Sequence, residues 1–353
     1  MDYSQLSPPK SWQKVAHWAW EEIAMSFQLS RRQIISSGLV SIASLPVSGP
    51  AWAQAWPAKP IRIVVSYPAG GLTDLFARAY GDYISQKLGQ PVVVENKPGA
   101  GGSIGALAVK GAPPDGYTLM FTITTTMAMN RVLYRNLPYD ADKDFVLISY
   151  MPSGGLPFVA AKATGASDLK EFAEYASKNK VNVGTYAAGS LAHIAVAELN
   201  KHFGLQMEAV HYRGEAPMWQ DLAAGVIQAA TGSYAAASNV LQSGAGKAIA
   251  VTQNKRLKKL PEVATFLEQG VTARAFQLRG YICAAGPTGI PPEIVQRLSD
   301  LMVEGGKSER VQKLLDTFGV DESAAGHQDF RKLYDEENPI WISLVQGLGL
   351  TPE

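Results

Sequence analysis

The sequence predicts an α/β fold built from doubly wound sheets and divided into two lobes. Three observations predict it: short β-branched runs alternate with amphipathic helical segments, glycines or prolines separate them, and 353 residues suffice for two domains. The composition, with 46% hydrophobic and 18% charged residues, excludes a disordered chain, a coiled coil and a collagen-like repeat. A formal net charge of +1 argues against a dedicated nucleic-acid-binding protein. We therefore expect a protein that binds a small molecule.

The first predicted unit is a strand, a helix and a second strand. Residues 61–66 form a β-branched run between two prolines, which is typical of a strand. A glycine-containing break follows, and Thr73 or Asp74 can cap a helix whose apolar positions repeat with the helical period. Gly89 ends this helix, and residues 92–95 form the next strand. Because the connection is this compact, the unit predicts a parallel βαβ arrangement.

The same alternation continues along the rest of the chain. We expect further strands at residues 118–122, 181–184, 209–212, 226–231, 248–251 and 282–285. We expect further helices at residues 105–110, 168–179, 191–203, 216–224, 291–304 and 308–318. Residues 167–170 match the S-x-x-K pattern of acylating serine enzymes, but the sequence lacks the S-D-N and K-T-G partners. We therefore interpret Ser167 and Asp168 as the N-cap of a helix.

The N-terminal segment differs from the rest of the chain and has the pattern of an export signal. The pair Arg31 and Arg32 precedes a modestly apolar run at residues 34–47, and a small-x-small site follows at residues 51–53. The paired arginines and the weak hydrophobicity indicate the twin-arginine route, so we expect a periplasmic protein. The run is too short to span a membrane, and the alternative, a short buried helix, lacks helix caps. Met25 lies six residues before the arginine pair and is an alternative start.

No constellation of catalytic or metal-binding residues emerges from the sequence. Cys283 is the single cysteine, so we expect a buried, inert thiol and exclude an intramolecular disulfide or a multi-cysteine metal site. His193, His202 and His211 are spaced by nine residues and do not share a helical face, so each is interpreted as a satisfied surface or core histidine. Residues 99–105 follow a strand, but their third glycine is misplaced for the G-x-G-x-x-G dinucleotide motif. We expect no cofactor, no metal and no enzymatic activity.

Three loops at predicted strand ends have the composition of an anion-binding site. Residues 67–74 and 184–190 each contain glycines and lead from a strand into a helix. Glycines let backbone N–H groups approach a ligand closely, and the helix N-terminus adds partial positive charge. Residues 124–126 are three threonines after another strand and offer hydroxyl groups. Because ligands of doubly wound sheets bind beyond the carboxyl ends of strands, these loops predict a site for a small anion.

Motifs along nearly the whole chain after the export signal resemble the Bug family, the extracytoplasmic solute receptors of tripartite tricarboxylate transporters. They lie at residues 56–62, 67–74, 94–102, 114–119, 137–140 and 212–214, followed by Pro217, Asp221 and Leu222. The resemblance implies a type II periplasmic-binding-protein fold, in which two doubly wound lobes are joined by crossing strands. The lobes would comprise residues 54–156 plus 283–353 and residues 157–282, after a signal segment at residues 1–53.

The resemblance also implies the ligand and the residues that hold it. The ligand would be a small carboxylate captured between the lobes by a monomeric receptor, whose partners are membrane transporter components or a sensor. The residues expected to bind the ligand are Tyr67, Ala69, Gly70, Gly71, Thr73, Asp74, Thr124, Thr125, Thr126, Thr185, Tyr186, Ala187, Gly189, Ser190, His193, Arg213, Gly214 and Gly232.

One departure from the family pattern bears on the chemistry of the ligand. Gly232 and Ser233 stand where the family usually carries an aspartate, often followed by asparagine. A desolvated ammonium group needs a carboxylate or several acceptors, which this cleft lacks unless Asp74 or Glu215 reaches into it. We therefore expect a carboxylate without an ammonium group. Arg213 is a candidate bidentate partner for a second carboxylate, or else a solvated residue at the edge of a lobe.

The alternative interpretation is an exported α/β hydrolase-like enzyme. Acyl transfer needs a nucleophile and a positioned acid–base partner, and the sequence offers no recognisable pair of that kind. The binding receptor is therefore the leading hypothesis. A ligand recovered unchanged after binding would favour the receptor, and turnover would favour the enzyme.

Overall fold

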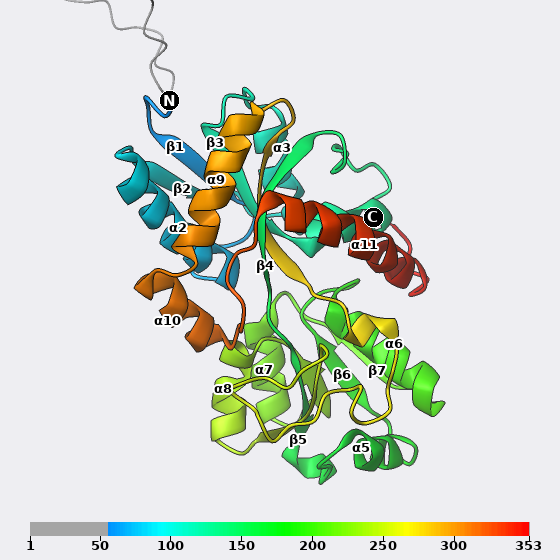
Figure 1. Cartoon of the computed structure of the whole chain (residues 1–353). Coiled ribbons are helices and arrows are strands. Elements are labelled where there is room, and N and C mark those ends of the chain that lie inside the picture. The colour runs from blue at the N-terminus through cyan, green and yellow to red at the C-terminus, as the bar shows by residue number, and fades with distance from the viewer. Residues whose placement is uncertain (1–55, 353) are drawn as a thin grey trace, which may run out of the picture. The chain divides into compact units, whose positions relative to one another are not determined.

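The computed structural model describes residues 56–352 of the chain. The expected export signal, with Arg31, Arg32 and the alternative start Met25, lies outside the described residues. Within the described part, no helix is both long enough and apolar enough to cross a membrane. The described residues form two five-stranded sheets flanked by helices (Figure 1), which confirms the predicted α/β class. We call each sheet with its helices a lobe and number the lobes in chain order.

Lobe 1 is built on a sheet with the strand order β2-β1-β3-β10-β4. Its strands are β1 (Ile61–Val65), β2 (Val92–Asn96), β3 (Thr118–Ile123), β4 (Phe145–Pro152) and β10 (Tyr281–Pro287). Its helices are α2 (Leu72–Leu88), α3 (Ser103–Lys110), α4 (Asn130–Leu133), α9 (Pro292–Gly305), α10 (Glu309–Phe318) and α11 (His327–Gln346). Strand β1 pairs in parallel with β2 and β3, whereas β10 pairs antiparallel with β3 and β4. Four strands therefore run one way and β10 runs against them.

Lobe 2 repeats this architecture with the strand order β7-β6-β8-β5-β9. Its strands are β5 (Pro157–Ala161), β6 (Asn182–Thr185), β7 (Glu208–His211), β8 (Ala229–Thr231) and β9 (Gly246–Val251). Its helices are α5 (Leu169–Ala176), α6 (Leu191–Phe203), α7 (Glu215–Ala223) and α8 (Tyr234–Gln242). Strand β6 pairs in parallel with β7 and β8, and β5 pairs antiparallel with β8 and β9. Each lobe is thus a mainly parallel sheet with one reversed strand.

Two connections carry the chain between the lobes, from β4 to β5 and from β9 to β10. Each connection enters the reversed strand of the sheet that it reaches. The connections lie side by side, because the Ser153 N–H donates to the Gly280 carbonyl at 2.7 Å. Leu156 exchanges two hydrogen bonds with Thr252: the Leu156 N–H donates to the Thr252 hydroxyl at 2.8 Å, and the Thr252 N–H donates to the Leu156 carbonyl at 3.1 Å. The expected lobe boundary after residue 282 falls inside β10, whose pairing with β4 already includes Tyr281 and Ile282.

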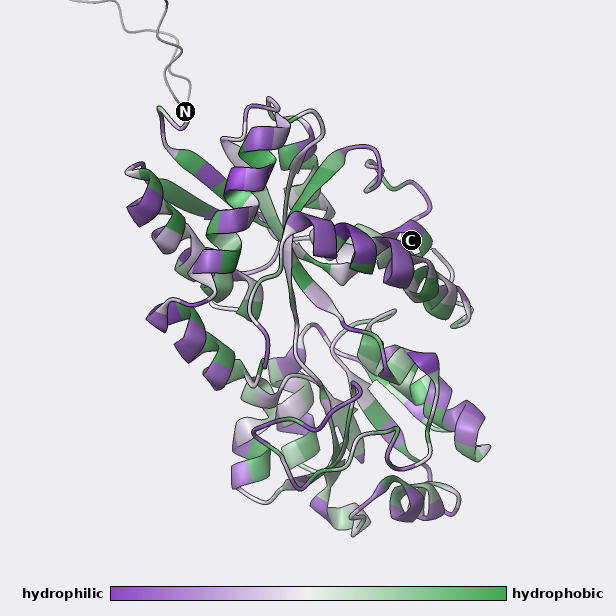
Figure 2. Ribbon diagram, in the orientation of Figure 1, coloured by the Kyte–Doolittle hydropathy of each residue, from purple (hydrophilic) through white to green (hydrophobic). Residues whose placement is uncertain are grey.

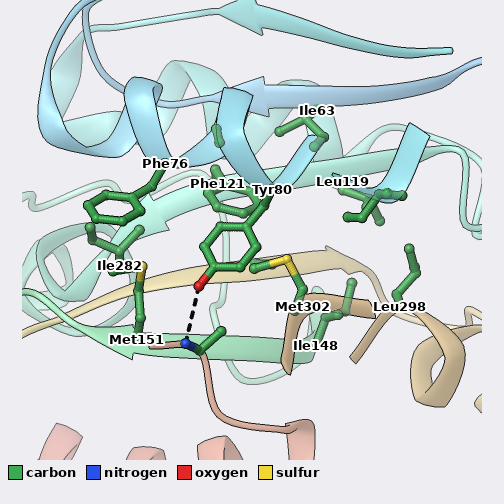
Figure 3. Close-up of a cluster of buried hydrophobic side chains, with 14 of the residues drawn as sticks. Ile63, Phe76, Tyr80, Leu119, Phe121, Ile148, Met151, Ile282, Leu298 and Met302 are labelled. Carbon is green, nitrogen blue, oxygen red and sulfur yellow. Dashed lines mark hydrogen bonds between the residues drawn. The ribbon is translucent and has the colours of Figure 1, made fainter. Parts of the chain in front are cut away.

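Hydrophobic side chains buried between each sheet and its helices form the cores of the lobes. In lobe 1, Phe76 and Tyr80 of α2 pack with Phe121 of β3 in one core, and a second core lies against the other side of the sheet. Figure 3 shows the first core and the hydrogen bond in which the Ala324 N–H donates to the Tyr80 hydroxyl at 3.2 Å. Hydrophobic residues line the strands, while hydrophilic residues concentrate on the helices (Figure 2). This division is typical of sheets that are covered by helices.

Most expected elements are confirmed to within a few residues. Helix α6 has the expected bounds and ends at Gly204, whose φ is 66°. Asp168 caps α5 as expected, because its side chain accepts a hydrogen bond from the Glu171 N–H at 2.8 Å. The structure adds elements that were not expected, among them β4, β5, α8 and α11. Strands β4 and β5 are almost fully buried, so they lack the alternation of polar and apolar residues that marks a strand, and α11 contains Pro339.

Candidate ligand site

Helix α2 begins at the first expected loop without a side-chain cap. Its N-cap is Gly71, with φ −79° and ψ 171°, and no side chain accepts a hydrogen bond from this end. Neither Thr73 nor Asp74 is the N-cap, which corrects the expectation, because the helix already starts at Leu72. Gly70 has a positive φ of 80°, and a methyl group there would meet nothing within 4 Å. N–H groups at an uncapped helix N-terminus are donors for an anion.

Asp74 supports this loop from within the lobe. It is buried, and its oxygens accept hydrogen bonds from the Gly70 N–H at 2.9 Å, from Arg78 Nε at 3.1 Å and from Asn96 Nδ2 at 2.9 Å. A second contact to the Arg78 guanidinium, at 2.9 Å, completes an ion pair. Burial opposes ionisation, yet these hydrogen bonds hold the pKa of the carboxyl below its ordinary value. The charge of Asp74 is therefore balanced, and its oxygens are occupied by the protein.

Three side chains of lobe 1 converge on the carbonyl of Gly101. The Tyr67 hydroxyl donates to it at 3.2 Å, the Thr126 hydroxyl at 3.0 Å and Asn130 Nδ2 at 3.0 Å. Burial raises the pKa of Tyr67, so the hydroxyl keeps its proton. A methyl group on Gly102 would lie 2.3 Å from Thr126 Oγ1. Glycine at this position therefore allows the backbone and Thr126 to meet.

Residues 99–102, which include the Gly101 carbonyl that accepts these three hydrogen bonds, were not expected to support the site. All four residues have a positive φ, from 46° at Ala100 to 127° at Gly99. Residues 101–105, Gly-Gly-Ser-Ile-Gly, also fit the G-x-S-x-G pattern of hydrolases, which the sequence reasoning overlooked. Ser103 starts α3, but its hydroxyl accepts a hydrogen bond from Asn130 Nδ2 at 3.3 Å and contacts no histidine in the described part of the chain. The geometry therefore gives Ser103 no general base.

The three threonines after β3 do not form an open loop. A π-helical turn at Thr125–Met129 starts there and leads into α4. Thr124 is buried, and its hydroxyl accepts a hydrogen bond from the Tyr281 N–H at 2.8 Å, which ties β3 to β10. The Thr125 hydroxyl contacts Met129 Sδ at 3.7 Å. Thr126, whose hydroxyl lies 3.2 Å from that of Tyr67, is the threonine whose side chain contacts the first loop.

The second expected loop forms hydrogen bonds with its own residues and with α6, and it packs against lobe 1. Ser190 caps α6, because its hydroxyl accepts a hydrogen bond from the His193 N–H at 3.4 Å and donates to the Ala187 carbonyl at 2.7 Å. Gly189 has a φ of 71°, and a methyl group there would lie 2.5 Å from the Leu133 side chain of α4. Side chains of α6 and α11 share a hydrophobic core at this junction. The two lobes therefore touch at the N-terminus of α6.

His193 and His211 come together beside this loop. Their ring centres are 4.4 Å apart, although the residues lie on different elements, α6 and β7, so the spacing argument did not apply. His193 Nδ1 accepts a hydrogen bond from the Gly189 N–H at 3.2 Å, and His211 Nδ1 lies 2.7 Å from the hydroxyl of buried Thr185. Burial, with His211 nearby, lowers the pKa of His193 to about 4. The His193 ring is therefore neutral and carries its proton on Nε2.

Glu215 occupies the space that a side chain on Gly232 would need. A methyl group on Gly232 would lie 3.1 Å from the carboxyl carbon of Glu215 and 3.2 Å from its Oε2. The carboxylate accepts hydrogen bonds from the Ser233 N–H at 3.1 and 3.0 Å and from the Ser233 hydroxyl at 2.6 Å. The turn before it is tied to the second loop, because the Gly214 N–H donates to the Tyr186 carbonyl at 3.1 Å. Glu215 thus places a carboxylate beside Gly232 and Ser233.

Two further side chains of lobe 2, Tyr186 and Arg213, belong to the expected site. Burial raises the pKa of the Tyr186 phenol, and the negative charge of Glu215 and the phenol of Tyr67 act in the same direction. Arg213 is exposed and forms neither a hydrogen bond nor an ion pair with another described residue. Ala69 is likewise exposed, whereas Thr73 is buried in the first turn of α2.

Other features of the described chain lie apart from this junction. A hollow of about 870 Å³ in lobe 2 is lined by Ser167, Phe203, Lys247 and Gln269, among others, and by none of the expected ligand-binding residues. Cys283 is buried as expected, and burial raises the pKa of its thiol, which disfavours the reactive thiolate. The described residues contain no group of three or more His, Cys, Asp or Glu placed to hold a metal ion.

Comparison with known proteins assigns the family. The model for the tripartite tricarboxylate transporter family receptor matches residues 76–350. A UPF0065 protein of Bordetella pertussis is 30% identical over 93% of this chain and 99% of its own length. The structure of R. palustris Rpa4515 with adipate is 28% identical, with a TM-score of 0.75 over 84% of this chain and 100% of that chain. The periplasmic binding protein BugD is 27% identical, with a TM-score of 0.71 over 84% of this chain and 100% of that chain. This chain belongs to the family of tripartite tricarboxylate transporter receptors, as its resemblance to the Bug proteins predicts.

Proposed function

We propose that this chain is a periplasmic receptor that binds a small carboxylate between its two lobes. The observation that carries the proposal is the uncapped N-terminus of α2 at Gly71, within the family motif at residues 67–74. A helix N-terminus stabilises an anion through its partial positive charge and its unpaired N–H groups. The relative whose structure contains adipate supports a dicarboxylate as the ligand class.

In this proposal lobe 1 anchors the ligand and lobe 2 closes over it. One carboxylate accepts hydrogen bonds from the N–H groups of Leu72 and Thr73, beside the Tyr67 hydroxyl. Tyr186 and Arg213 approach from lobe 2, and the exposed guanidinium of Arg213 is suited to a second carboxylate. The paired connections between the lobes suit a hinge, and contacts made only in the closed state would drive closure.

We also propose how the receptor is exported and to which partners it delivers its ligand. The arginine pair directs export by the twin-arginine route. The receptor then hands the unchanged solute to transporter components or a sensor in the membrane. Replacing Arg31 and Arg32 by lysine tests the export step, because a variant that still accumulates in the periplasm would contradict the twin-arginine route.

A calorimetric titration of the purified receptor tests carboxylate binding. The probes are succinate, glutarate and adipate, and the matched diamides, which keep the carbon chain but lose the charges, are the controls. We expect one or more dicarboxylates to bind and the diamides to fail. At a hundred times its Kd, a ligand raises the free energy of unfolding by about 2.7 kcal/mol. Equal behaviour of acids and diamides would contradict the proposal, and recovery of a chemically altered ligand would favour the hydrolase alternative.

A further inference from the structure

Glu215 is a half-buried carboxylate at the lobe junction whose charge no described side chain balances. It lies in the first turn of α7, and its hydrogen bonds all come from Ser233. No described Lys, Arg or His lies within 4.0 Å of its oxygens. Asp74, the carboxylate of the first loop, is in contrast paired with Arg78 at 2.9 Å. The two carboxylates therefore differ in what they can still bind.

Ser233 and Gly232 hold the Glu215 carboxylate in a defined place. Ser233 is the N-cap of α8 and donates to the carboxylate through both its N–H and its hydroxyl. A methyl group on Gly232 would lie 2.9 Å from the Trp219 ring and 3.1 Å from the Glu215 carboxyl carbon, so glycine lets both groups pack against the backbone here. Ionised carboxylates offer about four lone-pair sites, and Ser233 uses fewer than that. The remaining acceptor capacity of Glu215 is free for a ligand.

Two buried polar atoms beside Gly232 also lack partners. Trp219 Nε1 and Thr231 Oγ1 form no hydrogen bond with any described residue, and the exposed fractions of these residues are 4% and 0%. The Trp219 ring would lie 2.9 Å from a methyl group on Gly232. Buried polar atoms are normally paired, because an unpaired one costs free energy. Of these groups, Glu215 and the Thr231 hydroxyl can accept a hydrogen bond from a ligand, whereas the indole N–H of Trp219 can only donate one.

We propose that Glu215, beside Gly232, is the ionic partner of an ammonium group on the bound carboxylate. The inference rests on the proposed function and narrows the ligand to amino-substituted carboxylates. A carboxylate with no cationic neighbour attracts an ammonium group and repels a second carboxylate at the same place. The inference reverses the expectation of a ligand without an ammonium group. That expectation followed from the absence of charge on Gly232 and Ser233, and the structure places the Glu215 carboxylate beside both residues.

Matched ligand pairs test the inference by calorimetry. The pairs are succinate and aspartate, glutarate and glutamate, and adipate and 2-aminoadipate, with both enantiomers of each amino compound. We expect the amino member of at least one pair to bind at least about tenfold more tightly. The Glu215→Gln variant should bind that amino member about ten- to hundredfold more weakly, because the charge is removed while an acceptor for Ser233 is kept. Its effect on the plain member should be small or favourable.

The Glu208→Gln variant is the matched control, because it removes the same charge from an exposed residue of the same lobe. It should leave the preference for the amino member unchanged. If Glu215→Gln does not fold, Ser233→Ala replaces it, and a preference unaltered by Ser233→Ala contradicts the inference. Plain members that bind as tightly as amino members also contradict the inference and leave the proposed function intact. Failure of every acid in the panel to bind contradicts the proposed function itself.

Discussion

The N-termini of α2 and α6 follow similar glycine-containing loops, yet the structure treats them differently. Helix α2 starts at Gly71 with no side-chain cap, whereas the hydroxyl of Ser190 caps α6. Gly70 faces open space, while a methyl group on Gly189 would strike Leu133 at 2.5 Å. The first helix end therefore keeps its donors for an anion, and the second uses its space and hydrogen bonds for contact between the lobes. In the proposed function, similar loop compositions thus serve binding in one lobe and closure in the other.

The largest expected difference is in stability, between variants of Gly70 and Gly189, which both have a positive φ. Gly70→Ala and Gly189→Ala both force alanine into the left-handed region, which costs about 1–2 kcal/mol. Gly189→Ala also presses against Leu133, which adds about 1–3 kcal/mol if α4 must shift. We expect urea unfolding to show a clearly larger loss of stability for Gly189→Ala. Equal losses would mean that the second loop is as open as the first.

A change at the α2 N-cap should affect binding more than folding. Gly71→Asp adds a cap and a negative charge at a position where φ is −79° and the nearest neighbour of a methyl group is 3.5 Å away. We expect the affinity for the preferred carboxylate to fall at least about tenfold, because the new side chain competes for the same N–H groups. Stability should change by only a few tenths of a kcal/mol. Gly71→Ala controls for bulk alone, and a similar loss of affinity with alanine would contradict competition for the N–H groups.

The smallest expected effect is a difference in acid sensitivity between the two helix ends. The pKa of His193 falls from 6.5 to about 4 on folding, so its contribution to stability is present above pH 6.5 and is lost as the pH falls toward 4. The pKa of Asp74 is lowered from 3.8, so its contribution is lost only at more acidic pH. His193→Gln should therefore flatten the decline of unfolding free energy between pH 6.5 and 4, by less than about 1.4 kcal/mol per pH unit. His202→Gln, at an exposed position of the same helix, is the control, and identical pH slopes for both variants would refute the assignment.

Elements with local signals could be predicted from the sequence. The bounds of α6 follow from Ser190 at its start and Gly204, in the left-handed region, at its end. Strands β4 and β5, which carry the first crossing between the lobes, could not be predicted in the same way. They are buried along almost their whole length, so no alternation distinguishes them from a buried helix.

The loops of the candidate site could be predicted, but the partners of their side chains could not. Glycines after strands marked the loops at residues 67–74 and 184–190, because that composition is local. The pairing of Glu215 with Ser233 joins residues 18 positions apart through the arrangement of two helices. The contact between His193 and His211 likewise depends on the packing of a helix beside a strand. Such contacts arise from tertiary structure, so no spacing in the sequence predicts them.

The central claim is that a ligand carboxylate binds at the uncapped N-terminus of α2. A crystal structure of the receptor with its tightest-binding carboxylate tests this claim most directly. We expect a carboxylate oxygen at hydrogen-bonding distance, about 2.9 Å, from the N–H of Leu72 or Thr73. We also expect the α6 end to keep the hydrogen bond from the His193 N–H to Ser190. A carboxylate held at α6 or elsewhere, with the α2 N–H groups bound to no ligand atom, would contradict the account.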